Sequence, residues 1–500
     1  MKKNRVVSVF WWPAVIAAAV FVFAAAMVFS IGQSIWFDEG YSILLAKNSW
    51  SELFALTAVD AHPPFYYALL KVWGSVFGFD EFALRSLSAT LLSGTVVMVS
   101  LLLRRLFSAR VALLALPVII LGPFLLRYGY EVRMYSTALL IGVSATYMLV
   151  VALKEKRWWQ WGIYAVLVAL GMYTLYMMVV VWLAHFVWLL VQSLKKPRNK
   201  VTQWQWVYAY AAAVALFAAY IPTFLYQMTN SALPGIGSAI TLTRLSDITS
   251  VLLTFTPEWK LGGLLSLLIL AGIALLIWVG VQTHKHLTKI EKKHYGFLAV
   301  LVLVPLAFYT ITSLSSHPIF VNRYLAHVAI FIYALVGVTL ALGIVYQKKF
   351  KKLSYIPYLA YGVILVTLSI GLVQLQAAGN YIFERNQTPY TQQIRDSIKC
   401  SDALTIVADD PYTYIDSVYY FDNCDIRFFS ENDVEKKGGY APLHGSPARV
   451  GNQSELTAPI IMTLGWDGKE PSFELDERYK FVDEKVFGSQ LITTYRLIEE

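Results

Sequence analysis

Residues 36–41, Trp-Phe-Asp-Glu-Gly-Tyr, place two carboxylates, Asp38 and Glu39, shortly after an apolar run from Val6 to about Ile31. A basic N-terminus precedes this run, which is long enough to cross a bilayer, since a transmembrane helix needs about 20 apolar residues. The apolar core of a cleaved signal peptide is shorter, about 7–15 residues. We therefore expect an uncleaved first transmembrane helix that leads into an acidic, aromatic-rich loop.

The composition is typical of a membrane protein. The chain has 500 residues, of which 57% are hydrophobic and only 15% are charged, and this is too apolar for a soluble globular protein. The formal net charge is +9, but the basic residues lie in short clusters between apolar runs. They form no stripe with interleaved polar positions, which argues against nucleic acid as a partner.

Apolar runs of spanning length recur along the chain and predict eleven transmembrane helices. They cover residues 9–31, 82–103, 111–128, 134–153, 158–175, 177–194, 204–222, 261–281, 296–314, 325–346 and 355–377. A further apolar segment at residues 63–77 is too short to span and is typical of an interfacial or re-entrant helix. The predicted fold class is a polytopic α-helical membrane protein with about eleven transmembrane helices.

Basic clusters predict the orientation of these helices, because cytoplasmic loops are enriched in Lys and Arg. The clusters fall at every second loop: Lys2/Lys3/Arg5, Arg104/Arg105/Arg110, Lys154/Lys156/Arg157, Lys195/Lys196/Arg198/Lys200, Lys285/Lys289/Lys292/Lys293 and Lys348/Lys349/Lys351/Lys352. The N-terminus is therefore predicted to be cytoplasmic. The loop at 32–81 and the tail after about residue 379 then lie on the outer face of the cell membrane.

The tail changes composition and predicts a second domain. We expect a transmembrane domain at 1–379, which contains the outer loop 32–81, and a small extracytoplasmic α/β domain at 380–500. The tail has β-like runs at 403–408, 426–429 and 460–464, and helical patterns at 390–400 and 412–421. It also holds Cys400 and Cys424. An oxidising exterior permits a disulfide between them, but the sequence leaves two free thiols equally open.

Asp38 and Glu39 are the first candidates for chemistry. Trp36, Phe37 and Tyr41 surround them in sequence, so these carboxylates are expected to face a partly apolar site. Burial and neighbouring groups set the pKa of such a carboxylate, which suits it to act as a general base or to anchor a cation. The alternative is an interfacial acidic pair that ends a helix in water.

Asp60 and His62 form the second candidate pair, in Asp60-Ala-His-Pro-Pro64 of the same loop. The pair of prolines could simply start a helix, and Asp60 could be only a helix cap. Its position in the same outer loop as Asp38 favours a functional role instead. We expect Asp60 or His62 to orient an acceptor.

Two later outer turns carry arginines on the side where positive charge is disfavoured. The first holds Arg127, Glu131, Arg133 and Tyr135, and its arginines are expected to have specific partners. Arg133 could pair with Glu131, or it could bind a phosphate, which a guanidinium grips with two parallel hydrogen bonds.

The second of these turns holds His317, Arg323 and Tyr324, between two predicted spans. Arg323 could only reach towards lipid headgroups, as long basic side chains do at a membrane interface. Alternatively it contributes positive charge to the same site. A departing phosphate needs fixed positive charge where negative charge develops, and an acceptor hydroxyl or amine needs a base. Transfer from a lipid phosphate needs both together.

These motifs, in this order, resemble the GT-C type integral-membrane glycosyltransferases. The chain looks most like the bacterial branch near protein O-mannosyltransferases and the lipid A aminoarabinose transferase. The resemblance covers about the first 340 residues and lies in Trp36-Phe-Asp-Glu39, Asp60-Ala-His-Pro-Pro64, Leu84-Arg-Ser-Leu-Ser88, Tyr130-Glu-Val-Arg-Met-Tyr135 and Asn322-Arg-Tyr324. The tail is only loosely similar to the outer domain of this family.

The resemblance implies an inverting sugar transfer from a polyprenyl-phosphate donor. It implies that Asp38 is the catalytic base and that Glu131 and Arg133 form the second-loop part of the site. Members of this branch generally need no catalytic metal or other cofactor, unlike the oligosaccharyltransferases, whose Trp-Trp-Asp motif is absent here. The expected partners are the donor, membrane lipids and an acceptor, which could be a protein, a lipid or a polysaccharide.

Two other classes of function compete with this hypothesis. A transporter or flippase for a lipid-linked or anionic substrate would often show repeated halves and helices broken near mid-membrane. The sequence shows no such symmetry, and its candidate charged residues gather at one predicted face. A non-catalytic assembly scaffold would leave the outward carboxylates unexplained.

Overall fold

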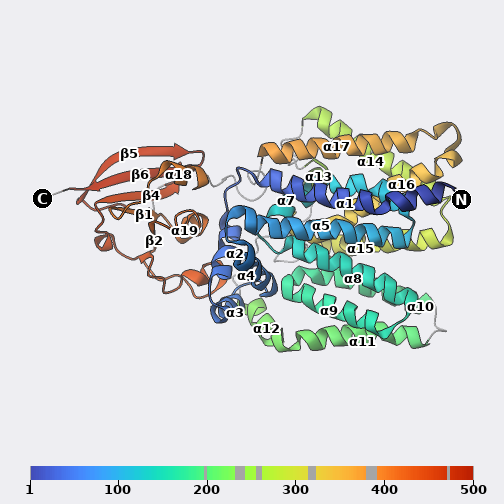
Figure 1. Ribbon diagram of the computed structural model, residues 1–500, viewed down its shortest axis with the longest axis horizontal. Helices are drawn as coiled ribbons and strands as arrows, with labels where there is room; N and C mark the ends of the chain where they lie inside the picture. Colours follow the sequence, from blue (N-terminus) through green and yellow to red (C-terminus); the bar gives the residue numbers. More distant parts are fainter. Residues whose placement is uncertain are drawn as a thin grey trace. The chain divides into compact units, whose positions relative to one another are not determined.

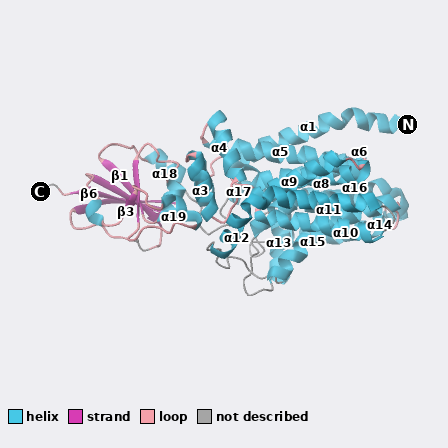
Figure 2. Ribbon diagram, turned by 90° about the horizontal axis from the view of Figure 1, so that it is seen from below, coloured by secondary structure: helices cyan, strands magenta, loops and turns pink. Residues whose placement is uncertain are grey.

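The computed structural model describes residues 2–195, 200–230, 242–254, 262–313, 322–378, 391–469 and 473–498. The chain forms two compact units, which are described separately. The first comprises Met1–Ile31, Arg85–Ile221 and Leu233–Gly379, and the second comprises Gly32–Leu84, Pro222–Ala232 and Asn380–Glu500. Strands occur, among the described residues, only in the C-terminal part of the second unit (Figure 2).

The first unit is built from helices (Figure 1). They are α1 (Lys2–Ser30), α5 (Glu81–Leu106), α6 (Ala109–Ile120), α7 (Pro123–Tyr130), α8 (Tyr135–Glu155), α9 (Trp158–Thr174), α10 (Val179–Lys195), α11 (Lys200–Phe217), α13 (Leu242–Thr254), α14 (Gly263–His284), α15 (Lys289–Ser313), α16 (Ala326–Tyr346) and α17 (Ile356–Ala378). The short 3-10 helix η4 (Asn322–Leu325) precedes α16.

Nine helices in the described part of the chain are long and apolar enough to cross a membrane, and α6 with α7 would make a tenth. The predicted class, a polytopic α-helical membrane protein, is therefore confirmed, and the number eleven is approximate. The remaining predicted span is α9, which has 17 residues and is shorter than the roughly 20 that a straight crossing takes.

The predicted span at 111–128 is formed by two helices, α6 and α7, with a bend between them. The chain bends by 66° between α6 and α7, next to Gly122 and Pro123. Pro123 is the first residue of α7, a position where proline is tolerated because the N–H that it lacks would have no partner within the helix. All eight residues of α7 are buried. A Cβ at Gly129 would collide with the side chain of Leu92, so α7 approaches α5 closely at a residue that has no side chain.

The second unit joins the Gly32–Leu84 segment to the C-terminal domain. The segment contains α2 (Phe37–Lys47), α3 (Trp50–Val59) and α4 (Phe65–Phe77), and α4 is the short apolar helix that the sequence predicts. The unit also includes most of α12 (Ile221–Asn230). The predicted domain boundary near residue 379 stays a prediction, although chain contacts group this segment with the C-terminal domain.

The C-terminal domain is a six-stranded sheet with the strand order β3-β2-β1-β4-β6-β5. The strands are β1 (Leu404–Ala408), β2 (Asp425–Phe429), β3 (Arg449–Val450), β4 (Ile460–Trp466), β5 (Tyr479–Phe487) and β6 (Gln490–Leu497), and the helices are α18 (Thr391–Ser397) and α19 (Pro411–Ser417). This agrees with the strands and helices that the sequence predicts here.

Strands β1 to β4 pair in parallel, whereas β6 pairs antiparallel with β4 and β5. Every residue of β1 is buried, as expected for a central parallel strand covered on both faces. One core cluster contains Val407, Val450, Leu456, Ile461, Phe473 and Tyr479. A disulfide joins Cys400 to Cys424, with Cα atoms 5.3 Å apart, which decides between the two states that the sequence leaves open.

Local hydrogen bonds explain where α3 begins. Ser49 Oγ accepts from the backbone N–H of Glu52, and the carboxylate of Glu52 accepts in return from the backbone N–H of Ser49 at 3.0 Å. This reciprocal capping box starts α3. The hydrogen bonds from the Ser49 side chain and backbone hold the pKa of Glu52 below its ordinary value.

Candidate active site

Asp38 and Glu39 lie in the first turn of α2 and have different surroundings. Glu39 is only 1% exposed, and its carboxylate accepts a long hydrogen bond of 3.4 Å from the backbone N–H of Trp36. Asp38 is partly exposed, and its backbone oxygen accepts from Ser42 Oγ at 2.8 Å. The pair begins a helix and does not end one in water. Of the two carboxylates, Asp38 is the more accessible to a substrate.

Asp60 and His62 lie together. The carboxylate of Asp60 is 3.2 Å from Nδ1 of His62, and Asp60 is 3% exposed. Asp60 is the C-terminal cap residue of α3, and Pro64 takes the N-terminal cap position of α4. A buried carboxylate at the carbonyl end of a helix opposes the helix dipole. Helix capping therefore does not account for Asp60.

A residue from a distant part of the sequence supports this end of α3. The side-chain amide of Gln227, on α12, donates to the backbone oxygen of Thr57 at 2.6 Å. Gln227 is itself buried. The carbonyl groups at the end of a helix lack partners within the helix, so this bond fixes the turn that leads into Asp60.

In the first unit, charged residues are buried where α7 ends and α8 begins. Arg127, Glu131 and Arg133 are each at most 3% exposed. Arg127 donates to the Glu131 carboxylate at 3.0 Å, and its guanidinium lies 5.3 Å and 5.4 Å from the ring centres of Tyr128 and Tyr130. The expectation that Arg127 has specific partners is confirmed. Buried charge within a helical membrane unit is costly and marks a functional site by default.

Backbone contacts hold the turn around Glu131. Its backbone oxygen accepts from the N–H of Arg133 at 2.7 Å and from Ser88 Oγ of α5 at 2.6 Å. Tyr135 packs edge-on against Tyr128, with ring centres 4.8 Å apart. Glu131, Arg133 and Tyr135 therefore share one well-packed turn.

The remaining predicted residues are only partly placed. Arg323 and Tyr324 lie half-buried in η4, in the first unit, and the backbone oxygen of Tyr324 accepts from the Tyr309 hydroxyl at 3.0 Å. His317 lies outside the described residues.

The predicted residues are divided between the two units. Asp38, Glu39, Asp60 and His62 belong to the second unit, and Glu131, Arg133, Tyr135, Arg323 and Tyr324 belong to the first. That both groups serve one active site stays a prediction. Within the described ranges, no group of three or more His, Cys, Asp or Glu residues could hold a metal ion.

Two buried groups were not predicted as site residues from the sequence. Arg127 forms the ion pair with Glu131. The two residues are four apart in the sequence, and this spacing favours an ion pair along a helix, so the sequence could have indicated the contact. Arg85 is 1% exposed and donates to the backbone oxygen of Ser30, at the end of α1, at 3.0 Å. A cation suits the carbonyl end of a helix, but nothing local in the sequence joins residues 30 and 85.

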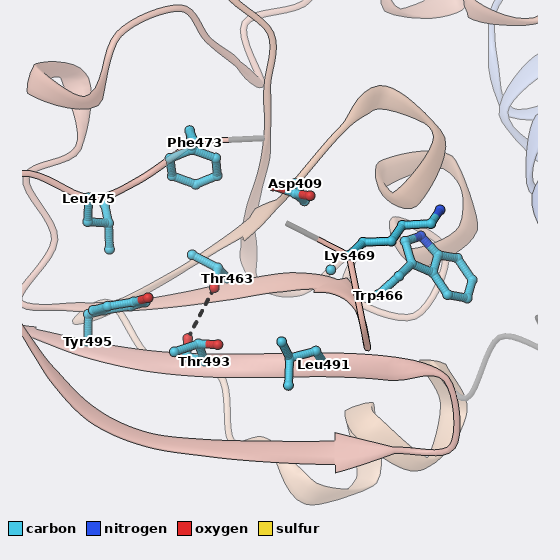
Figure 3. A pocket seen from close by; sticks show the side chains of 10 residues that line it. Asp409, Thr463, Trp466, Lys469, Phe473, Leu475, Leu491, Thr493 and Tyr495 are labelled. Carbon is cyan, nitrogen blue, oxygen red and sulfur yellow. Dashed lines mark hydrogen bonds between the residues drawn. The ribbon is translucent and has the colours of Figure 1, made fainter. Parts of the chain in front are cut away.

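A separate cavity lies in the C-terminal domain (Figure 3). It is lined by Asp409, Thr463, Gly465, Trp466, Lys469, Phe473, Leu475, Leu491, Thr493 and Tyr495. None of these residues is among the predicted site residues. One of them, Trp466 at the end of β4, also contacts α19.

Comparisons with known proteins agree with the resemblance that the motifs show. Residues 61–223 match the family described as dolichyl-phosphate-mannose-protein mannosyltransferase. This segment includes His62, Glu131, Arg133 and Tyr135. No curated protein matches the sequence.

Two solved structures of ArnT match over almost the whole chain. Apo ArnT from Cupriavidus metallidurans matches with a TM-score of 0.60 and 10% identity, covering 97% of this chain and 98% of that chain. ArnT bound to undecaprenyl phosphate matches with a TM-score of 0.57 and 13% identity over the same shares. The Archaeoglobus fulgidus oligosaccharyltransferase in its apo form matches at 0.46, with 12% identity, 82% of this chain and 64% of that chain covered. The family match, together with the fold shared with ArnT, supports a GT-C type membrane glycosyltransferase.

Proposed function

We propose that this protein transfers a sugar from a polyprenyl-phosphate donor to an acceptor at the outer face of the cytoplasmic membrane. The observation that carries the proposal is the buried cluster of Arg127, Glu131 and Arg133. A lipid phosphate that leaves a sugar needs such fixed positive charge near the membrane. The fold supports the same donor class, since ArnT with this fold is known with undecaprenyl phosphate bound.

The proposed transfer step inverts the anomeric carbon. A hydroxyl or amine of the acceptor attacks that carbon, and its proton passes to the carboxylate of Asp38, with Glu39 beside it. The bond between the anomeric carbon and the phosphate oxygen breaks, and polyprenyl phosphate leaves with the bonding electron pair. General base catalysis of this kind contributes about 10²–10⁴-fold to a rate.

The other predicted residues then divide between donor and acceptor. Arg133 and Arg323 stabilise the negative charge that develops on the phosphate, and Glu131 fixes the turn that carries Arg133. Tyr135, Tyr324 and His317 contribute to donor binding. Asp60 and His62 orient the acceptor, which is a protein, a lipid or a polysaccharide.

The proposed topology follows from the basic clusters. The N-terminus is cytoplasmic, and the C-terminal domain is extracytoplasmic, so that lipid-linked donor and acceptor meet at the outer surface. A fluorescent or enzymatic reporter fused to the C-terminus tests this, because its activity depends on the compartment that it reaches.

The decisive experiment for the function is chemical. Purified protein in detergent is incubated with undecaprenyl-phosphate hexose or aminopentose and a cell-envelope extract as the source of acceptor. The proposal predicts release of undecaprenyl phosphate and labelling of an envelope component. A transporter or flippase would leave the donor chemically intact, and that result would refute the proposal.

The sugar and the acceptor can be identified in cells. Mass spectrometry of the envelope glycans from a deletion strain, compared with its parent, is expected to show the loss of one sugar modification. Restoration of the modification by the wild-type chain, but not by a variant without Asp38, links the change to transfer.

A further inference from the structure

We propose that the C-terminal domain positions the helix that carries Asp38, through residues 411–422 and the short 3-10 helix η7 (Gly438–Leu443). This rests on the proposed role of Asp38 as the base. It gives the C-terminal domain a part in the transfer step, through contacts that all lie within the second unit.

Aromatic rings hold the beginning of α2. Phe37, the residue before Asp38, stacks on Tyr412 of α19, with ring centres 4.5 Å apart and planes within 3° of parallel. Tyr440 of η7 meets the same ring edge-on at 5.7 Å. A phenylalanine ring fixed on two sides allows little rotation of the helical turn that it begins. That turn carries Asp38.

The backbones of α2 and α19 also touch directly. A Cβ placed on Gly40 would lie against the backbone oxygen of Ile415, well inside contact distance. Glycine lowers the stability of a helix interior relative to alanine, so its presence in α2 has to be explained by something else. The close approach of α19 supplies that explanation.

Two adjacent tyrosines hold both ends of the Gly32–Leu84 segment. The hydroxyl of Tyr420 accepts from the backbone N–H of Ile35 at 2.7 Å and donates to the carboxylate of Glu81 at 2.5 Å. The hydroxyl of Tyr419 donates to the backbone oxygen of Phe79 at 3.1 Å. The segment is therefore anchored before α2 and again at the start of α5.

Helix α19, which carries Tyr412, is itself held to the sheet. The indole N–H of Trp466, at the end of β4, donates to Thr413 Oγ1 of α19 at 3.0 Å. The ring centre of Trp466 lies 6.4 Å from that of Tyr412. Figure 3 shows Trp466 beside Lys469 at the edge of the cavity. Tyr412 is thus backed by a buried strand residue.

Positioning matters because a general base must lie within hydrogen-bond reach of the proton that it takes, about 2.6–3.2 Å between heavy atoms. A displacement of about 1 Å can lower a rate 10²-fold. Loss of the Phe37–Tyr412 contact is therefore expected to lower kcat and to leave the KM for the donor nearly unchanged, because the donor contacts predicted for Arg133 are untouched.

The test compares full-length Tyr412→Ala with Phe481→Ala, which removes an exposed ring from β5 of the same domain. We expect kcat to fall about 10–100-fold in Tyr412→Ala and to stay at the wild-type value in Phe481→Ala. In a double-mutant cycle, Phe37→Ala with Tyr412→Ala is expected to be no slower than Phe37→Ala alone, because both changes break one contact.

Gly40→Ala is the second variant, because it favours the helix but forces α19 away from α2. We expect it to lower kcat as Tyr412→Ala does, with kcat calculated per monodisperse, folded protein. Wild-type kcat in Tyr412→Ala or in Gly40→Ala overturns the positioning role. If the wild-type protein itself releases no polyprenyl phosphate, the proposed function is wrong. The activity of the wild type therefore distinguishes a failure of the proposed function from a failure of the positioning role.

Discussion

Buried charge is the feature of single residues that most constrains the function of this protein. Arg127 and Glu131 form an ion pair with almost no exposure to solvent, inside a unit that is built mainly from apolar helices. Replacement of a buried ion pair by apolar residues is often neutral or stabilising, so stability alone does not explain the pair. The proposed function offers a reason for the pair, because it places a lipid phosphate beside Arg133 in the same turn.

Arg133→Gln tests the phosphate contact. Removal of one group that stabilises developing negative charge lowers turnover by about 10²–10³-fold, and we expect a loss of that size in donor consumption by purified protein. Arg133→Lys keeps the charge but loses the planar guanidinium, so its turnover is expected to lie between those of the wild type and Arg133→Gln. Arg105→Gln is the matched control, because Arg105 pairs with Glu155 at a partly exposed site. Near wild-type turnover in Arg133→Gln would exclude this role.

Asp60 and His62 are predicted to act as a pair. Their 3.2 Å contact lets the buried carboxylate fix the orientation of the imidazole. We expect Asp60→Asn and His62→Ala each to raise the KM for the acceptor and to lower kcat, and the double variant to be no worse than the more damaging single change. Steady-state kinetics with varied acceptor measure this. Independent, multiplying effects in the double variant would show that the two side chains act separately.

Among the elements, α19 has the most consequences for the predicted site, because it packs on α2 and is held by β4. Its N-terminal cap is Asp410, whose carboxylate accepts from the backbone N–H of Thr413 at 2.7 Å. Pro411 follows at the first position of the helix, where proline is well tolerated. A short helix of this kind depends strongly on its cap.

Asp410→Ala is expected to destabilise the C-terminal domain by about 1 kcal/mol, the usual cost of a lost N-terminal cap. If α19 positions α2, the same variant also lowers kcat. Thermal unfolding and donor turnover measure the two effects, and Asp402→Ala in an exposed turn serves as the control. Unchanged thermal stability in Asp410→Ala would show that the cap contributes nothing to the folded domain.

The transmembrane helices could be predicted from the sequence, but the bend between two of them could not. Most spans appear in the sequence as long apolar runs, because lipid contact and burial in the bundle both favour apolar side chains. The 66° bend between α6 and α7 is different, because Pro117 lies inside α6 without ending it while Pro123 begins a new helix. Proline alone therefore does not tell where such a helix bends.

For the whole molecule, contacts between distant parts of the sequence could not be predicted. Asp38, Asp60 and Arg133 are predicted as site residues from local motifs, and their roles stay predictions. The stacking of Phe37 on Tyr412 joins residues far apart in the chain, and no local pattern indicates it. Ile35 and Tyr420 are joined by a similarly distant hydrogen bond. The contacts from which the role of the C-terminal domain is proposed appear only in the structure.

The central claim is that Asp38 takes the proton of the acceptor while polyprenyl phosphate leaves. Asp38→Asn keeps the size of the side chain and removes its basicity, so it tests the claim most directly. Release of polyprenyl phosphate by purified, folded Asp38→Asn protein is expected to fall by at least about 10²-fold, with undecaprenyl phosphate binding retained in a thermal-shift measurement. Turnover close to that of the wild type in this variant would contradict the account.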